Sequence, residues 1–225
     1  MKYQSNITCR DLAPAFRHTF VDTGAVGHDV MHDEDFDRAC GYISHDEAAI
    51  LAAIASAVGG DWLEIGSHTG WSASHIALGA DSVVCVDPEF ARPDFRGRAW
   101  GNMQRAGIAG KIELRILGGF ADEKFTGAFI DGNHSPPEPL NDAKMVYDSL
   151  RERAAVVFHD FIGWPVHDGV RWLIDQGMKF RIYSTQQMMA VCWRGDIEIP
   201  VHVPDPAIDW DGIRRRTRFD FKGES

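Results

Sequence analysis

Short apolar runs alternate with segments of helical spacing through the middle of the chain. Five of these runs are too short for buried helices and are bounded by turn residues, which is typical of strands. They cover residues 62–65, 82–86, 112–117, 127–130 and 155–158. Between them, apolar residues recur every three or four positions. The clearest such stripe is Leu140, Ala143, Tyr147 and Leu150. Strands that alternate with helices in this way predict a parallel sheet with helices on both faces.

Start and stop signals frame this alternation. A capping-box pattern at residues 44–47 predicts the start of a helix that Gly59 and Gly60 end. After the fifth strand, Pro165 and Gly177 fit the first position and the cap of another helix. Two further apolar runs then predict an antiparallel hairpin. They cover residues 180–183 and 188–193.

The expected fold class is therefore α/β, a doubly wound and mostly parallel Rossmann-like sheet with helices on both faces and a C-terminal antiparallel hairpin. We expect an N-terminal arm at residues 1–43, a folded domain at residues 44–194 and an irregular C-terminal tail at residues 195–225. The arm shows no sustained period, and the tail holds several prolines and arginines. Either could pack on a second copy of the chain, which leaves a homo-oligomer open.

Composition and charge exclude several classes of binding partner. The chain carries 23 basic and 33 acidic side chains, a net charge of −10, which argues against nucleic acid and against an anionic membrane surface. Its apolar runs are shorter than the roughly 20 residues of a membrane span, and its start lacks a signal-peptide stretch. The dispersed cysteines indicate neither a disulfide framework nor a zinc site. They are Cys9, Cys40, Cys85 and Cys192. We therefore expect a cytoplasmic chain without a membrane partner.

Ligands of open parallel sheets bind at the carboxyl ends of the strands. After the first strand, Gly66 and Gly70 permit a tight turn and a close approach of the backbone to a ligand. His68 stands where a dinucleotide fingerprint needs its second glycine, so a nicotinamide cofactor is disfavoured. Asp87 ends the second strand and is placed to accept both ribose hydroxyls of a nucleoside. The pattern therefore fits adenosine without a pyrophosphate.

Four segments at these strand ends carry a family resemblance. They are Trp-Leu-Glu-Ile-Gly-Ser-His-Thr-Gly-Trp-Ser at 62–72, Val-Cys-Val-Asp-Pro at 84–88, Phe-Ile-Asp-Gly-Asn-His at 129–134 and Val-Phe-His-Asp at 157–160. Over about residues 44–194 the chain resembles class I S-adenosylmethionine-dependent methyltransferases. Within that class it is similar to the small metal-dependent O-methyltransferase branch, which includes catechol-type and antibiotic-sugar enzymes.

The resemblance implies S-adenosylmethionine as cofactor and assigns residues to it. The turn beside the methionine part comprises Glu64, Gly66, Ser67, Thr69 and Gly70. Ser72 would reach the cofactor carboxylate, and Asp87 would hold the ribose. Gly118 and Phe120 would approach the adenine, although this chain has Gly-Gly-Phe where relatives more often carry a polar residue.

A second group of residues follows the fourth and fifth strands. Asp131 and Asp160 end neighbouring strands, so their carboxylates should face the same crevice, with His159 beside one of them. Such oxygens suit a hard divalent cation such as Mg²⁺, and the resembling branch binds a metal here. The family's usual acidic pair after the fifth strand is His159-Asp160 in this chain, and Asn133 replaces an acid. In the alternative, Asp131 binds the cofactor's ammonium group and Asp160 caps the next segment.

His134 is the candidate base. It lies in the turn that leaves the fourth strand, and related sugar O-methyltransferases place a histidine at the same D-x-x-H spacing. A neutral imidazole accepts a proton near pH 7, and an aliphatic hydroxyl needs both a base and a nearby cation to lose one. The alternative is a histidine that only caps the turn.

The leading hypothesis is methyl transfer to a hydroxyl of a small molecule with help from a divalent metal, in which Asp131 and His134 take part in catalysis. A metal-independent methyltransferase that acts on another acceptor atom is the first alternative. A nucleoside-binding module that keeps the fold without turnover is the second alternative.

Overall fold

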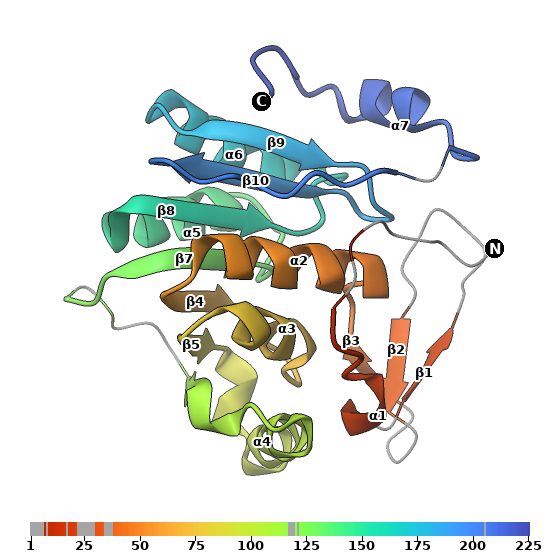
Figure 1. Cartoon of the computed structure of the whole chain (residues 1–225), viewed down its shortest axis with the longest axis vertical. Coiled ribbons are helices and arrows are strands. Elements are labelled where there is room, and N and C mark those ends of the chain that lie inside the picture. The colour runs from red at the N-terminus through yellow and green to blue at the C-terminus, as the bar shows by residue number, and fades with distance from the viewer. Residues whose placement is uncertain are drawn as a thin grey trace.

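The computed structural model describes residues 7, 9–16, 18–21, 30–33, 38–116, 120, 122–204 and 206–225, and only the backbone for those of residues 18–40. Figure 1 shows a central sheet flanked by helices, with a small sheet from the N-terminal region to one side. Among the described helices, none is long and apolar enough to cross a membrane.

Seven strands form the central sheet in the order β6-β5-β4-β7-β8-β10-β9. They are β4 (Asp61–Ile65), β5 (Ser82–Val86), β6 (Ile112–Arg115), β7 (Phe125–Ile130), β8 (Leu150–Phe158), β9 (Lys179–Tyr183) and β10 (Met189–Arg194). Strand β10 is antiparallel to both of its neighbours, β8 and β9. All pairs among the other strands, from β6 to β8 in the sheet order, are parallel. This confirms the expected fold class and the C-terminal hairpin.

The register brings the strand ends level. Ile65 at the end of β4 pairs with Val86 of β5 and with Ile130 of β7, and Ile130 pairs in turn with Phe158 of β8. Because these strands are parallel, the residues that follow them lie along one edge of the sheet. The fold therefore brings together the four segments that carry the family motifs.

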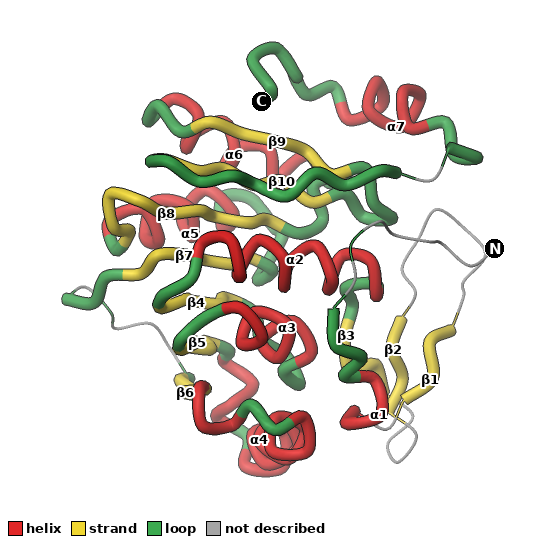
Figure 2. Tube along the Cα trace, viewed as in Figure 1, coloured by secondary structure: helices red, strands yellow, loops and turns green. Residues whose placement is uncertain are grey.

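Helices cover both faces of the sheet (Figures 1 and 2). One hydrophobic cluster joins the sheet to α2 (His45–Val58), α3 (Trp71–Gly79) and α4 (Pro93–Ala106). A second cluster joins the opposite face to α5 (Glu138–Asp148), α6 (Trp164–Asp175) and α7 (Trp210–Thr217). Two short 3-10 helices lie on either side of α4: Pro88–Ala91 connects β5 to it, and Ala109–Lys111 connects it to β6.

The capping box predicted before α2 is present. The Ser44 hydroxyl accepts a hydrogen bond from the Glu47 N–H at 3.2 Å, and the Glu47 carboxylate accepts one from the Ser44 N–H at 2.9 Å. Both bonds satisfy N–H groups that a helix start leaves unpaired. The helix ends where Gly59 takes up a φ of 66°, as the sequence predicted.

The structure corrects two expectations and adds detail to the N-terminal arm. The arm holds α1 (Ala13–Phe16) and an antiparallel sheet of β1 (His18–Val21), β2 (Val30–Asp33) and β3 (Arg38–Gly41). The C-terminal tail contains α7, which the Asp209 side chain caps by accepting from the Gly212 N–H at 2.9 Å. Leu150, expected on a helix, begins β8, because α5 ends at Asp148.

Gly127 of β7 provides a test of the packing on which the sheet depends. It pairs with Trp62 of β4, whose side chain is fully buried, and a Cβ on Gly127 would lie 2.1 Å from Trp62 Cε2. We expect Gly127→Ala to lower the free energy of unfolding in urea by about 1 to 3 kcal/mol, because the indole must move.

The matched control is Gly97→Ala on α4. Gly97 is exposed, and a Cβ there would meet nothing within 4 Å. Its replacement should raise the free energy of unfolding by roughly 0.5 to 1 kcal/mol through the helix propensity of alanine. Equal stability of Gly127→Ala and the wild type would contradict the packing described.

Candidate active site

A cavity of about 450 Å³ opens at the carboxyl ends of β4, β5, β7 and β8. This volume is within the range of roughly 300 to 1,000 Å³ that small-molecule sites occupy. The lining residues are Gly41, Tyr42, Ile43, Gly66, Ser67, His68, Trp71, Ser72, Asp87, Pro88, Asp131, Gly132, Asn133, His134 and Asp160. The cavity therefore lies where an open parallel sheet is expected to bind its ligand.

The turn after β4 lies directly against the end of β7. Gly66 adopts a φ of 85°, and a Cβ at this position would lie 2.2 Å from the backbone oxygen of Asp131. Its N–H donates to the Val86 carbonyl at 2.9 Å, while the Asp131 N–H donates to the Ile65 carbonyl at 2.9 Å. Glycine is required here, and the close contact places Asp131 at the wall of the cavity.

Asp87 links the ends of β4 and β5. One carboxylate oxygen accepts a hydrogen bond from the His68 N–H at 2.7 Å, and the other accepts from the Glu89 N–H at 2.8 Å. A carboxylate offers about four acceptor sites, so two backbone donors leave capacity for ribose hydroxyls. The bond from His68 also helps to hold this residue at a φ of 44°, a left-handed conformation that is costly for residues other than glycine.

Two buried polar side chains beneath this turn lack hydrogen-bond partners. Glu64 is fully buried, and among the described residues neither of its carboxyl oxygens is bonded; the same holds for the Ser67 hydroxyl. Burial raises the pKa of Glu64 to about 7 and the charge of Asp131 adds to the rise, while the nearby Ser67, Ser72 and Cys85 side chains oppose it. The protein thus satisfies these buried groups only in part, which leaves hydrogen-bonding capacity for a ligand.

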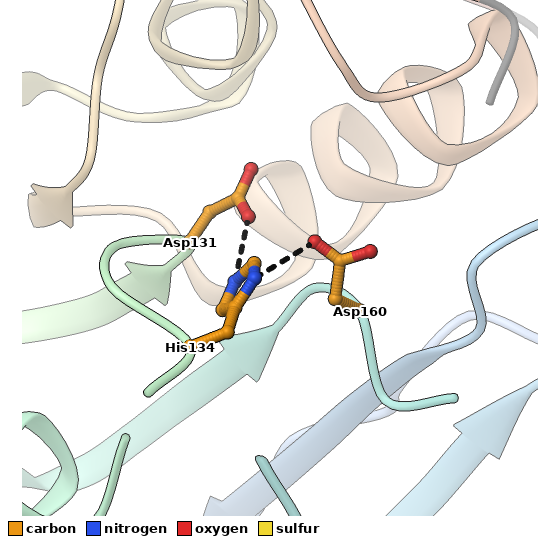
Figure 3. Close-up of side chains that lie close together, drawn as sticks. All are labelled: Asp131, His134 and Asp160. Atoms are coloured by element: carbon orange, nitrogen blue, oxygen red, sulfur yellow. Dashed lines mark ion pairs between the residues drawn. The ribbon is translucent and has the colours of Figure 1, made fainter. Parts of the chain in front are cut away.

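Asp131, His134 and Asp160 line the same cavity, and their side chains lie close together, as Figure 3 shows. His134 Nε2 lies 3.5 Å from Asp131 Oδ1, and His134 Nδ1 lies 3.4 Å from Asp160 Oδ2. The contact with Asp131 raises the pKa of His134; burial opposes the rise and Asp160 adds to it. Asp160 has a φ of 51°, so strain accompanies this group.

His159 lies behind this group and outside the lining of the cavity. Its side chain is fully buried, with Nε2 3.3 Å from the Glu47 carboxylate. Its Nδ1 lies 3.1 Å from Asp160 Oδ2 and 3.3 Å from Asp131 Oδ1. Burial disfavours its charge, but the carboxylates of Asp131 and Glu47 outweigh burial and hold the pKa of His159 well above its usual range.

The residues predicted from the sequence separate into two sets. Those that line the cavity are Gly66, Ser67, Ser72, Asp87, Asp131, His134 and Asp160. Those that do not line it are Glu64, Thr69, Gly70, Phe120 and His159. Phe120 packs in the core with its ring centroid 5.9 Å from that of Phe125. Gly118 lies outside the described residues.

Part of the cavity wall could not be predicted from the sequence. Gly41, Tyr42 and Ile43 come from the end of the N-terminal region, where no motif indicated a site. Long-range contacts bring them there: the Trp71 indole N–H donates to the Ile43 carbonyl at 3.1 Å, and the Tyr42 and His68 ring centroids are 5.5 Å apart. His68 itself carried a usable signal, because a side chain replaces glycine in a turn that needs an unusual φ.

Residues 63–161 match a protein family described as a methyltransferase domain. No curated protein matches the chain significantly. The matched segment contains the turn after β4, the end of β5 and the ends of β7 and β8, and thus includes most of the cavity lining.

Solved structures share the fold at low sequence identity. The O-methyltransferase TomG from Streptomyces achromogenes, in complex with S-adenosylmethionine, is 16% identical over 84% of this chain and 92% of that chain, with a TM-score of 0.59. An O-methyltransferase from Bacillus cereus, in complex with S-adenosylhomocysteine, is 16% identical over 70% and 84%, with a TM-score of 0.54. An S-adenosylmethionine-dependent O-methyltransferase from Thermotoga maritima is 13% identical over 72% and 69%, with a TM-score of 0.57. Residues 63–161 are therefore similar to a methyltransferase domain, the chain shares the fold of these enzymes, and its resemblance to class I S-adenosylmethionine-dependent methyltransferases is confirmed.

Proposed function

We propose that the protein transfers a methyl group from S-adenosylmethionine to a hydroxyl of a small molecule. The observation that carries this proposal is that one cavity is lined both by Asp87, a carboxylate at a strand end that suits ribose hydroxyls, and by the Asp131–His134–Asp160 group. A cofactor held at Asp87 would therefore present its reactive end beside groups that can handle an acceptor proton.

The residues present fit this cofactor. The buried Ser67 hydroxyl, which has no hydrogen bond among the described residues, lines the cavity, and the buried Glu64 carboxyl belongs to β4, just before this turn. An amino acid moiety carries the donors and acceptors that such groups lack. TomG was solved with S-adenosylmethionine and the Bacillus cereus enzyme with S-adenosylhomocysteine, which supports the same cofactor here.

The chain's own residues would orient the acceptor and take its proton. When bound, S-adenosylmethionine supplies an electrophilic methyl group, so the protein needs to hold the acceptor oxygen in line and remove its proton. His134 is half-buried at the cavity wall and can accept that proton in its neutral form. The carboxylates of Asp131 and Asp160, on either side of its ring, would then stabilise the imidazolium that forms.

A divalent cation at the same place is the second candidate. Asp131, His134 and Asp160 each offer one ligand atom, and these atoms lie within 4.8 Å of one another. Two carboxylates with one imidazole make a donor set that suits divalent cations. When bound, such a cation would polarise the acceptor hydroxyl. In that case His134 is a ligand, and its lone pair is not free to act as the base.

A small molecule is the acceptor class that the chain's charge favours. With a net charge of −10, the protein would repel the phosphate backbone of a nucleic acid. Incubation of the protein with S-adenosylmethionine and a panel of phenols, catechols and sugars, followed by measurement of S-adenosylhomocysteine, tests the proposal. Release of the product only in the presence of a hydroxyl acceptor is expected. If the protein binds S-adenosylmethionine and S-adenosylhomocysteine but turns over no member of the panel, a non-catalytic module is favoured.

Asp87 provides a test of the cofactor site. Charge-assisted hydrogen bonds from ribose hydroxyls contribute about 1.5 to 3 kcal/mol each, so Asp87→Ala should weaken S-adenosylmethionine binding by at least about tenfold in calorimetry. Asp61→Ala is the control, because Asp61 lies at the opposite end of β4 and accepts a hydrogen bond from the Ser82 hydroxyl at 2.7 Å. Unchanged affinity in a folded Asp87→Ala protein would remove Asp87 from the site.

Replacement of His134 tests its role as the base. If it is the base, His134→Ala should lower kcat by about a hundredfold or more and leave cofactor affinity nearly unchanged. Asn133→Ala serves as the control, because Asn133 lines the same cavity and stabilises the same loop by accepting from the Ser135 N–H at 2.9 Å. Turnover of His134→Ala at the wild-type rate would leave the histidine a structural role.

The pH profile checks the same assignment. Asp131 raises the pKa of His134, so more of the imidazole is protonated at a given pH than in a free histidine. A base must be neutral to act, and kcat/KM should therefore fall as the pH drops through a value above the ordinary histidine pKa of about 6.5. If kcat/KM falls only at a pH below about 6.5, a group other than His134 is the base.

Metal removal distinguishes a reaction that needs a divalent cation from one in which His134 acts as the base without a metal. If Asp131, His134 and Asp160 hold a divalent cation, activity should fall in EDTA and return with Mg²⁺ or Mn²⁺. Equilibrium dialysis should then show about one bound ion per chain, which Asp160→Asn abolishes. Full activity in EDTA would exclude the cation from the reaction and leave His134 as the base.

A further inference from the structure

We infer that Glu47 is a positioning residue, which acts through His159 to hold Asp131 and Asp160 in the orientation that the active site needs. The inference rests on the proposed function, because the orientation of these carboxylates matters for catalysis only if the site carries out methyl transfer. The contacts themselves do not depend on it. The sequence indicates Glu47 only as half of a capping box, and nothing in the family resemblance assigns it a role in the reaction.

Glu47 bonds to three separate elements at once. It is almost fully buried in the first turn of α2, where one of its oxygens accepts from the Ser44 N–H at 2.9 Å. The other oxygen accepts from the Gln187 N–H at 3.1 Å, in the connection between β9 and β10. The first oxygen also lies 3.3 Å from Nε2 of His159, just past the end of β8. One carboxylate therefore fixes α2, this connection and β8 relative to one another.

His159 transmits this restraint to the active site. Its ring has no exposed surface, and its two nitrogens face opposite carboxylate groups. Nε2 faces Glu47, while Nδ1 lies within 3.3 Å of one oxygen each of Asp131 and Asp160. Since carboxylates only accept, both ring nitrogens must donate. The ring is thereby held with Nδ1 shared between the two carboxylates that flank His134.

A helix cap alone does not account for this arrangement. A capping box satisfies the start of a helix equally well at the surface, and burial of a carboxylate is unfavourable unless it is paired and fully bonded. Here the burial is compensated by His159, whose other partners belong to the active site. Without Glu47, Nε2 of His159 would lose its acceptor in a place that water does not reach. The ring would then no longer be fixed, nor would the two carboxylates that share its Nδ1 hydrogen.

The experiment compares Glu47→Gln with Ser44→Ala. Each variant disturbs the capping box, but only Glu47→Gln removes the carboxylate that faces His159. We expect kcat to fall by about tenfold to a hundredfold in Glu47→Gln, as small misplacements of reacting groups do. The affinity for S-adenosylmethionine and the KM for the acceptor should change little. Ser44→Ala should lower the Tm by a similar amount and keep its kcat.

Nuclear magnetic resonance provides a readout that does not need turnover. In ¹⁵N-labelled wild-type protein both ring N–H groups of His159 should be protected and observable, and the Nε2–H signal should be lost or shifted in Glu47→Gln alone. If Glu47→Gln does not fold, Glu47→Asp keeps the charge but withdraws it from His159, and should reduce kcat in the same direction.

Two results would overturn the inference. One is an equal loss of kcat in Glu47→Gln and Ser44→Ala, which would make Glu47 only a cap. The other is an unchanged ring signal in Glu47→Gln, which would show that Glu47 does not hold His159. A wild-type protein without turnover but with the expected ring signals would instead count against the proposed function, and would leave the structural link in place.

Discussion

The carboxyl ends of β4 and β7 meet so closely that no side chain fits between them. At this contact a Cβ on Gly66 would lie 2.2 Å from the Asp131 carbonyl oxygen, and the backbone of each strand end bonds to its neighbour. Glycine therefore allows the chain to turn there, which leaves room for the cavity above the sheet. The same contact sets Asp131 in the cavity wall, so the position of the candidate catalytic group follows from a backbone constraint.

Buried charge is the second determinant of the site. Glu47, Asp131 and Asp160 surround His159, and His134 stands between the last two on the side of the cavity. Burial opposes the charge of Glu47, but its pKa is still lowered to about 2 because His159 and backbone donors stabilise the carboxylate. Since breaking one member of a buried pair leaves the other uncompensated, these groups are expected to act as a unit.

Much of this arrangement could be predicted from the sequence. The parallel order of strands and the acids at their carboxyl ends follow from local patterns, and Asp87, Asp131 and Asp160 do line one cavity. The contacts that complete the site are long-range and leave no local signal. Tyr42 reaches the cavity from the N-terminal region, and Glu47 meets a histidine 112 residues further along the chain. The helix α7 could not be predicted, because its three buried side chains form too short an apolar stripe.

A crystal structure of the protein with S-adenosylhomocysteine tests the central claim most directly, because the claim is that one cavity holds both the nucleoside and the reacting groups. We predict the ribose hydroxyls on the Asp87 carboxylate, the amino acid end beside Ser67, and the sulfur facing Asp131, His134 and Asp160. A nucleoside bound away from Asp87, or with its sulfur turned from His134, would contradict the account.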